Sequence, residues 1–98
     1  MRLRWTEQAR NDLLQIGRYI AQDKPGAGRA WVQRLRERAR DAADMPLMGR
    51  KVPELDREDI REVILGGYRL VYRVRTDAME VLAVFDGRRL LSSADAPV

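Results

Sequence analysis

The sequence contains neither cysteine nor histidine among its 98 residues. The absence of cysteine excludes disulfides, thiol nucleophiles and thiolate metal sites. The absence of histidine removes imidazole, the side chain best suited to acid–base work near neutral pH. Any chemistry must therefore rely on arginine, lysine, tyrosine, hydroxyl or carboxylate groups, and we expect neither a metal nor a cofactor.

Long apolar runs are also missing. No stretch approaches the ~20 apolar residues that a membrane-spanning helix needs, and residues 1–7 lack the apolar core of a signal peptide. We therefore expect a cytoplasmic protein without a membrane partner.

Lysine is scarce, although the chain is basic. Lys plus Arg number 19 against 15 Asp plus Glu, which gives a net charge of +4, and only Lys24 and Lys51 are lysines. Such a balance favours acidic partners, either nucleic acid or an acidic protein surface. A genome rich in arginine codons explains the same bias equally well, so charge alone does not identify the partner.

The first half of the chain predicts two amphipathic helices. Thr6 is typical of an N-cap, and Pro25 is typical of the first turn of a new helix that extends to about Ala43. Apolar residues recur at helical spacing in both segments. They are Ala9, Leu13, Ile16 and Ile20 in the first, and Trp31, Leu35, Ala39 and Ala42 in the second. The short link between the helices makes them antiparallel neighbours.

The second half predicts an antiparallel meander. Residues 60–65, 68–75 and 80–85 are rich in strand-forming side chains, and Gly66-Gly67 suits a tight hairpin turn. Residues 1–5 predict a short edge strand, and residues 44–59 an irregular loop. The pattern is that of a two-layer α+β domain over residues 1–91, in which an antiparallel two-helix hairpin packs on an antiparallel sheet, with a flexible tail at residues 92–98. We expect the helical hairpin to cover one sheet face and the other to stay partly exposed.

Arginines alternate along the strand at residues 68–75. Arg69, Arg73 and Arg75 fall on one face, where they either bind an acidic target or pair internally with Glu62 or Glu80. The preceding loop carries four carboxylates whose spacing does not match a calcium loop. They are Glu54, Asp56, Glu58 and Asp59, and we expect them to be exposed to solvent.

Five blocks of the sequence stand out in order along the chain. The first is WTEQARNDL at residues 5–13, and the later ones are GRKVPEL at 49–55, IRE at 60–62, GYRLVYRV at 67–74 and GRR at 87–89. In this order they resemble blocks of the RelE/ParE superfamily of bacterial toxins, and most closely its ParE branch, whose opening pattern is W-T-x-x-A-x-x-D-L. The likeness extends from about Leu3 to Leu91.

The resemblance implies a toxin of a type II toxin–antitoxin pair, neutralised by a small antitoxin, for which a ribbon-helix-helix type is expected. ParE-like members poison DNA gyrase, whereas RelE-like members cleave mRNA on the ribosome. The same fold therefore supports two mechanisms, so the target must be inferred from the site residues. Contact with DNA or with the ribosome is expected only through that target. A third possibility is a domain that has lost toxicity and retains antitoxin binding.

The site residues favour the ParE-like function. Arg69 and Arg89 match arginines that RelE-type nucleases use, but Ile60 and Glu62 stand where such enzymes carry lysines. The family's frequent histidine in the last block is here Asp86, and no tyrosine follows Arg89. Arginine stays protonated and is a poor acid or base, so no carrier for the proton is evident. We therefore predict a non-enzymatic gyrase inhibitor, with mRNA cleavage as the alternative.

The predicted contact residues fall into two groups. Target binding is assigned to arginines of the central strand and of the last block, namely Arg69, Arg73, Arg88 and Arg89, with the last two favoured because internal partners are fewer there. Antitoxin binding is assigned to the two tryptophans, Trp5 and Trp31, with a core position as the alternative for Trp31.

Overall fold

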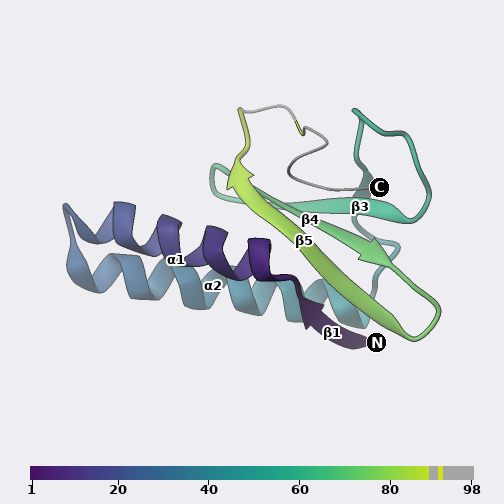
Figure 1. Cartoon of the computed structure of the whole chain (residues 1–98), viewed down its shortest axis with the longest axis horizontal. Coiled ribbons are helices and arrows are strands. Elements are labelled where there is room, and N and C mark those ends of the chain that lie inside the picture. The colour runs from purple at the N-terminus through teal and green to yellow at the C-terminus, as the bar shows by residue number, and fades with distance from the viewer. Residues whose placement is uncertain (89–90, 92–98) are drawn as a thin grey trace.

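The computed structural model describes residues 1–88 and 91 and contains two helices and five strands (Figure 1). In chain order the elements are β1 (Arg2–Trp5), α1 (Glu7–Ala21), α2 (Pro25–Asp44), β2 (Arg50–Lys51), β3 (Ile60–Leu65), β4 (Tyr68–Val74) and β5 (Ala78–Asp86). Both helices begin where the sequence predicts. Within the described residues, neither helix is long and apolar enough to cross a bilayer. The predicted tail at residues 92–98 lies outside the described part.

The strands form one mixed sheet in the order β1-β5-β4-β3-β2. Strands β2 to β5 are antiparallel, while β1 pairs in parallel with β5, from Arg2 opposite Ala78 to Trp5 opposite Val81. The predicted α+β fold with a helical hairpin on a sheet is confirmed. The expectation of a purely antiparallel sheet is corrected, because the whole chain between β1 and β5 acts as the long crossover that parallel pairing needs.

The start of β5 and the presence of β2 differ from the prediction. Arg75 N donates to Ala78 O (2.8 Å), which closes the second turn early and lets β5 begin at Ala78. Ala78 then pairs with β1, a long-range partner that local turn signals do not reveal. In the predicted loop, Arg50–Lys51 forms β2 against β3.

The Thr6 hydroxyl joins the start of α1 to β5. Its oxygen accepts a hydrogen bond from Ala9 N (3.1 Å), as an N-cap does, and the hydroxyl lies 3.0 Å from Val81 O, to which it donates. Six residues further on, the Asp12 carboxylate accepts from Val84 N (2.9 Å). The helix is therefore held along the last strand by polar contacts from two of its side chains.

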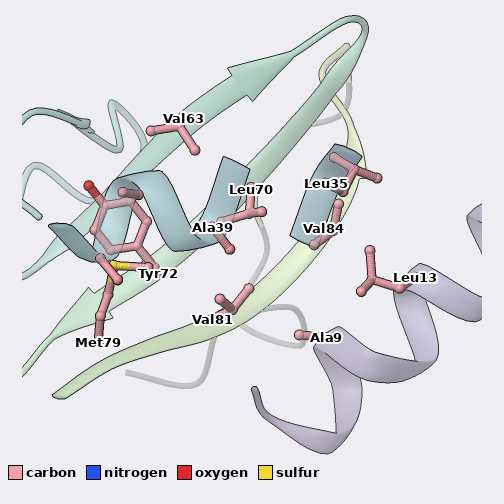
Figure 2. Packing of buried hydrophobic residues seen from close by; sticks show 12 residues of the cluster. Ala9, Leu13, Leu35, Ala39, Val63, Leu70, Tyr72, Met79, Val81 and Val84 are labelled. Carbon is pink, nitrogen blue, oxygen red and sulfur yellow. The ribbon is translucent and has the colours of Figure 1, made fainter. Parts of the chain in front are cut away.

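The main core lies between the helices and the sheet (Figure 2). Leu13 from α1 and Leu35 and Ala39 from α2 pack against Leu70 and Val84 of the sheet. Each of these side chains is almost fully buried, and burial of a leucine contributes about 1.5–3 kcal/mol to folding. The apolar stripes predicted from helical spacing thus face the sheet.

A second, smaller core covers the opposite sheet face. It contains Val52, Ile60, Val71, Leu82, Ala83 and Phe85, with Leu55 and Leu91 packed against it. This face is covered only in part, as expected: Val52 and Leu55 pack over it, whereas Ile64 near the β3–β4 turn is 45% exposed. The β4–β5 register skips Leu82, and this irregularity lets Leu82 and Ala83 both point into the second core.

Candidate target-binding site

Arg69 is an internal structural residue at the centre of an ion-pair network. Its side chain projects from β4 into the second core and leaves Arg69 only 4% exposed. Nε donates to Glu62 on β3 (2.6 Å), while Nη1 and Nη2 donate to the two oxygens of Glu54 (2.7 and 2.8 Å). The second oxygen of Glu62 accepts from Arg50 Nε (2.6 Å). The predicted internal pairing of Arg69 with Glu62 is confirmed.

Glu54 is the loop carboxylate that closes this network. The Arg69 guanidinium lowers the pKa of Glu54 from 4.5 to about 2, and the Glu54 carboxylate in turn raises the pKa of Arg69. Glu54 also accepts a hydrogen bond from Leu91 N (2.7 Å). The expectation of a solvent-exposed acidic cluster is therefore wrong for Glu54.

The other loop carboxylates pair near the surface. Asp56 and Glu58 lie 3.4 and 3.5 Å from Lys51 Nζ, and Asp59 accepts from Arg57. Exposed pairs of this kind contribute little to stability. The loop is thus anchored mainly by Glu54 and by the buried Val52.

Arg73 follows Arg69 on the same face of β4 and is half-buried. The register places it between Ile60 of β3 and Glu80 of β5. Glu80 lies 3.4 Å from the Nε of Arg75, beyond the end of the strand. The alternating arginines thus become steadily more exposed towards the end of the strand, and none of them faces the helices.

Arg88 lies beside a hollow of about 440 Å³ where the β3–β4 turn meets the end of β5. We call it the turn-end hollow; its walls are Ile64, Gly66, Gly67, Tyr68, Asp86, Gly87 and Arg88. A hydrogen bond from Gly87 N to Gly67 O (2.6 Å) joins its two sides. The Arg88 side chain is 92% exposed and donates through Nε and Nη2 to Asp86 (3.1 and 2.8 Å). Asp86 therefore orients the cation without covering it.

Trp31 packs against the β3–β4 turn that lines the turn-end hollow. Gly66 has φ of +57°, and a Cβ there would lie 2.5 Å from the Trp31 ring. The ring meets Tyr68 edge-on at 5.8 Å, and the Arg34 guanidinium lies 4.5 Å from its centroid. Trp31 is half-buried and braces the turn from α2. Trp5 is also half-buried and packs against the main core.

The charged groups of the hollow shift one another's pKa values. Hydrogen bonds from Arg88 lower the pKa of Asp86 to about 2, and burial, followed by the Asp86 charge, raises the pKa of Tyr68 above its ordinary value. The Asp86 carboxylate raises the pKa of Arg88 as well. The ion pair between Asp86 and Arg88 therefore favours the charged form of both side chains.

The structure brings together only part of the predicted site. Arg88 lies at the turn-end hollow, Arg69 and Arg73 lie on the second sheet face, and Arg89 falls outside the described residues. Sequence reasoning missed the contributions of Ile64 and Tyr68 to the hollow. Tyr68 directly follows Gly66-Gly67, which is a local signal for its place at the turn, whereas Ile64 pairs with Arg69 and has no such signal in the sequence.

Comparisons with known proteins agree with this fold. A family model described as "ParE toxin of type II toxin-antitoxin system, parDE" matches residues 3–91. A solved chromosomal ParDE toxin–antitoxin system from P. aeruginosa contains a chain that is 21% identical, with a TM-score of 0.75; the match covers 88% of this chain and 95% of that chain. A chain of the toxin–antitoxin complex RelBE2 from Mycobacterium tuberculosis is 26% identical, with a TM-score of 0.62 and coverage of 87% and 95%. No curated protein matches the sequence.

Proposed function

The chain belongs to the ParE toxin family of type II toxin–antitoxin systems, and from this premise we propose that it is a non-enzymatic inhibitor of DNA gyrase. In this proposal the toxin arrests growth in the cytoplasm by holding gyrase on cleaved DNA, and a cognate antitoxin neutralises it. The contact is made by Arg88 at the turn-end hollow and by its sequence neighbour Arg89.

The observation that carries the proposal is the contrast between Arg69 and Arg88. Arg69, which matches a nuclease arginine, is buried and saturated by the carboxylates of Glu54 and Glu62. Withdrawing it to bind a phosphate would leave Glu54 without its cation and the buried Glu62 with Arg50 alone, which is strongly unfavourable. Arg88 is exposed, oriented and adjacent to apolar surface from Ile64 and Tyr68. This combination supports a protein or DNA contact without chemistry.

The remaining residue assignments stay predictions. Arg73 is half-buried on the second sheet face and is open to a target only from that side. Trp5 and Trp31 are half-buried, and each is assigned to the antitoxin contact. The two solved relatives are described as a toxin–antitoxin system and a toxin–antitoxin complex, which supports an antitoxin partner here; we expect one of ribbon-helix-helix type.

The gyrase proposal is tested with purified toxin and gyrase from the same host. We expect plasmid DNA to accumulate as covalently trapped, cleaved complexes, and expression of the toxin alone to arrest growth with DNA-damage signalling. Unchanged supercoiling together with an absence of trapped complexes would exclude gyrase as the target.

Ribosome-dependent mRNA cleavage is the second candidate, favoured by the likeness to a chain of the RelBE2 complex. Primer extension on ribosome-bound message distinguishes it. New 3′ ends within codons would support the nuclease, and we expect none, because the sequence contains no histidine and Ile60 and Glu62 stand where such nucleases carry lysines. Arg69→Gln provides a second measurement. If the toxin is a nuclease, this variant loses more cleavage activity than its smaller amount of folded protein explains.

A further inference from the structure

An apolar corner follows the end of α2. Met45, Leu47 and Met48 are 57%, 66% and 73% exposed, although each is a large apolar residue. We call residues Met45–Met48 the methionine corner. Isolated exposed apolar side chains are common on protein surfaces, but three within four residues form a patch, and such patches mark interaction sites.

The backbone of the methionine corner is anchored from inside the protein. Tyr72 Oη donates to Pro46 O (2.6 Å), and Arg61 Nη1 donates to Leu47 O and Gly49 O (3.3 and 2.9 Å). These contacts hold the main chain, so the fold does not depend on the identity of the exposed side chains. The apolar residues are therefore presented on a fixed frame, which lowers the entropic cost of binding.

Two hollows meet at the corner. One of about 450 Å³ is lined by Asp44 and the corner itself, and a neighbouring one of about 250 Å³ has Met45, Met48 and Val63 in its lining. Arg38 and Asp41 also line the smaller hollow and form its polar rim. An apolar core with a charged rim is the usual composition of a protein-binding surface.

We propose that the methionine corner binds an amphipathic segment of the antitoxin, with apolar side chains seated between Met45 and Met48 and a carboxylate facing Arg38. This rests on the antitoxin pairing in the proposed function and does not depend on gyrase. The unbranched, polarizable methionines adapt to such a segment. A second copy of this chain fits less well, because each copy carries a net charge of +4.

The location of the corner separates antitoxin binding from target binding. The hollows of the corner and the turn-end hollow share no lining residue: Val63 of β3 lines the smaller corner hollow, whereas its neighbour Ile64 lines the turn-end hollow. Changes at the corner are therefore expected to alter antitoxin affinity and leave the activity of the free toxin unchanged.

The experiment compares antitoxin affinity of the wild-type toxin, a Leu47→Ser/Met48→Ser variant and a matched control, Tyr19→Ser. Tyr19 is 71% exposed on α1, so the control removes a large exposed side chain away from the corner. We expect the corner variant to bind the purified antitoxin about 10- to 100-fold more weakly, the control to bind within about threefold of wild type, and all three to unfold at the same temperature. Arg38→Gln is expected to weaken antitoxin binding and to make the antitoxin affinity less dependent on salt concentration.

Three outcomes overturn the inference. Equal affinity of the corner variant and wild type excludes the corner as an antitoxin site. A dimer that the corner variant converts to monomer, with antitoxin affinity retained, assigns the corner to self-association. A wild-type chain that binds no antitoxin refutes the pairing itself. The gyrase proposal fails separately: wild-type toxin that traps no gyrase, while the corner variant still binds the antitoxin more weakly, would refute that proposal and support the inference.

Discussion

At the scale of single residues, the two glycines of the β3–β4 turn have different roles. Gly66 adopts φ of +57° over the Trp31 ring, whereas no atom lies within 4 Å of a Cβ placed on Gly67. Left-handed backbone costs an L-residue about 1–2 kcal/mol before any clash. We expect Gly66→Ala to lower the free energy of unfolding by about 2 kcal/mol or more, measured by urea denaturation. Gly67→Ala is the control and should change it by less than ~0.5 kcal/mol; equal effects would contradict this assignment.

Glu54 makes the stability of the protein depend on pH in a defined window. Its folded-state pKa of about 2 lies below the ordinary value of 4.5, so its contribution is present above pH 4.5 and is lost as the pH falls towards 2. The expected loss is on the order of 2 kcal/mol. Unfolding free energies measured between about pH 6 and pH 2 should fall more steeply for wild type than for Glu54→Gln. Parallel curves for the two proteins would show that Glu54 is not held by Arg69.

At the scale of elements, one hydroxyl couples α1 to the sheet. Thr6 both caps the helix and donates to β5. We expect Thr6→Val, which keeps the shape and removes the hydroxyl, to destabilise the protein by about 1–2 kcal/mol. Thr6→Ser retains both hydrogen bonds and should recover most of that loss. Chemical denaturation of the two variants checks this, and a Thr6→Val protein as stable as wild type would rule out the coupling.

The elements that the sequence predicts are those with local signals. Thr6 and Pro25 mark the helix starts, and Gly66-Gly67 marks the hairpin, because a cap, a fixed φ angle and a tight turn each depend on neighbouring residues. Strand β2 and the first residues of β5 escaped prediction because their hydrogen bonds come from β3 and β1. The parallel pairing of β1 likewise joins segments that are about 75 residues apart.

The same distinction explains the candidate site. Of the two carboxylate partners of Arg69 discussed above, the sequence could predict Glu62, because it lies on the neighbouring strand of a local hairpin. Its second partner, Glu54, comes from a loop whose path over the sheet no periodicity reveals. The exposure of Arg88 agrees with its place at a strand end. The turn-end hollow depends on Trp31 reaching under the turn from α2, which is a tertiary contact.

At the scale of the whole molecule, the candidate target surface and the folding core are separate. Because the Arg88 side chain is exposed, Arg88→Ala should leave the unfolding temperature unchanged. As the proposed target contact, Arg88 should be needed for inhibition, so the same variant is expected to inhibit gyrase about tenfold or more weakly. Arg57→Ala, which removes another surface arginine, should keep full inhibition. Concentration series in a supercoiling assay compare the two variants. Equal loss in both would indicate a general effect of charge.

The most direct test of the central claim is the fraction of plasmid DNA that host gyrase holds as cleaved complexes in the presence of the purified toxin. The account predicts that this fraction rises with toxin concentration, returns to its basal level when the antitoxin is added first, and rises much less with Arg88→Ala. A cleaved fraction that stays at its basal level at every concentration of folded wild-type toxin would contradict the account.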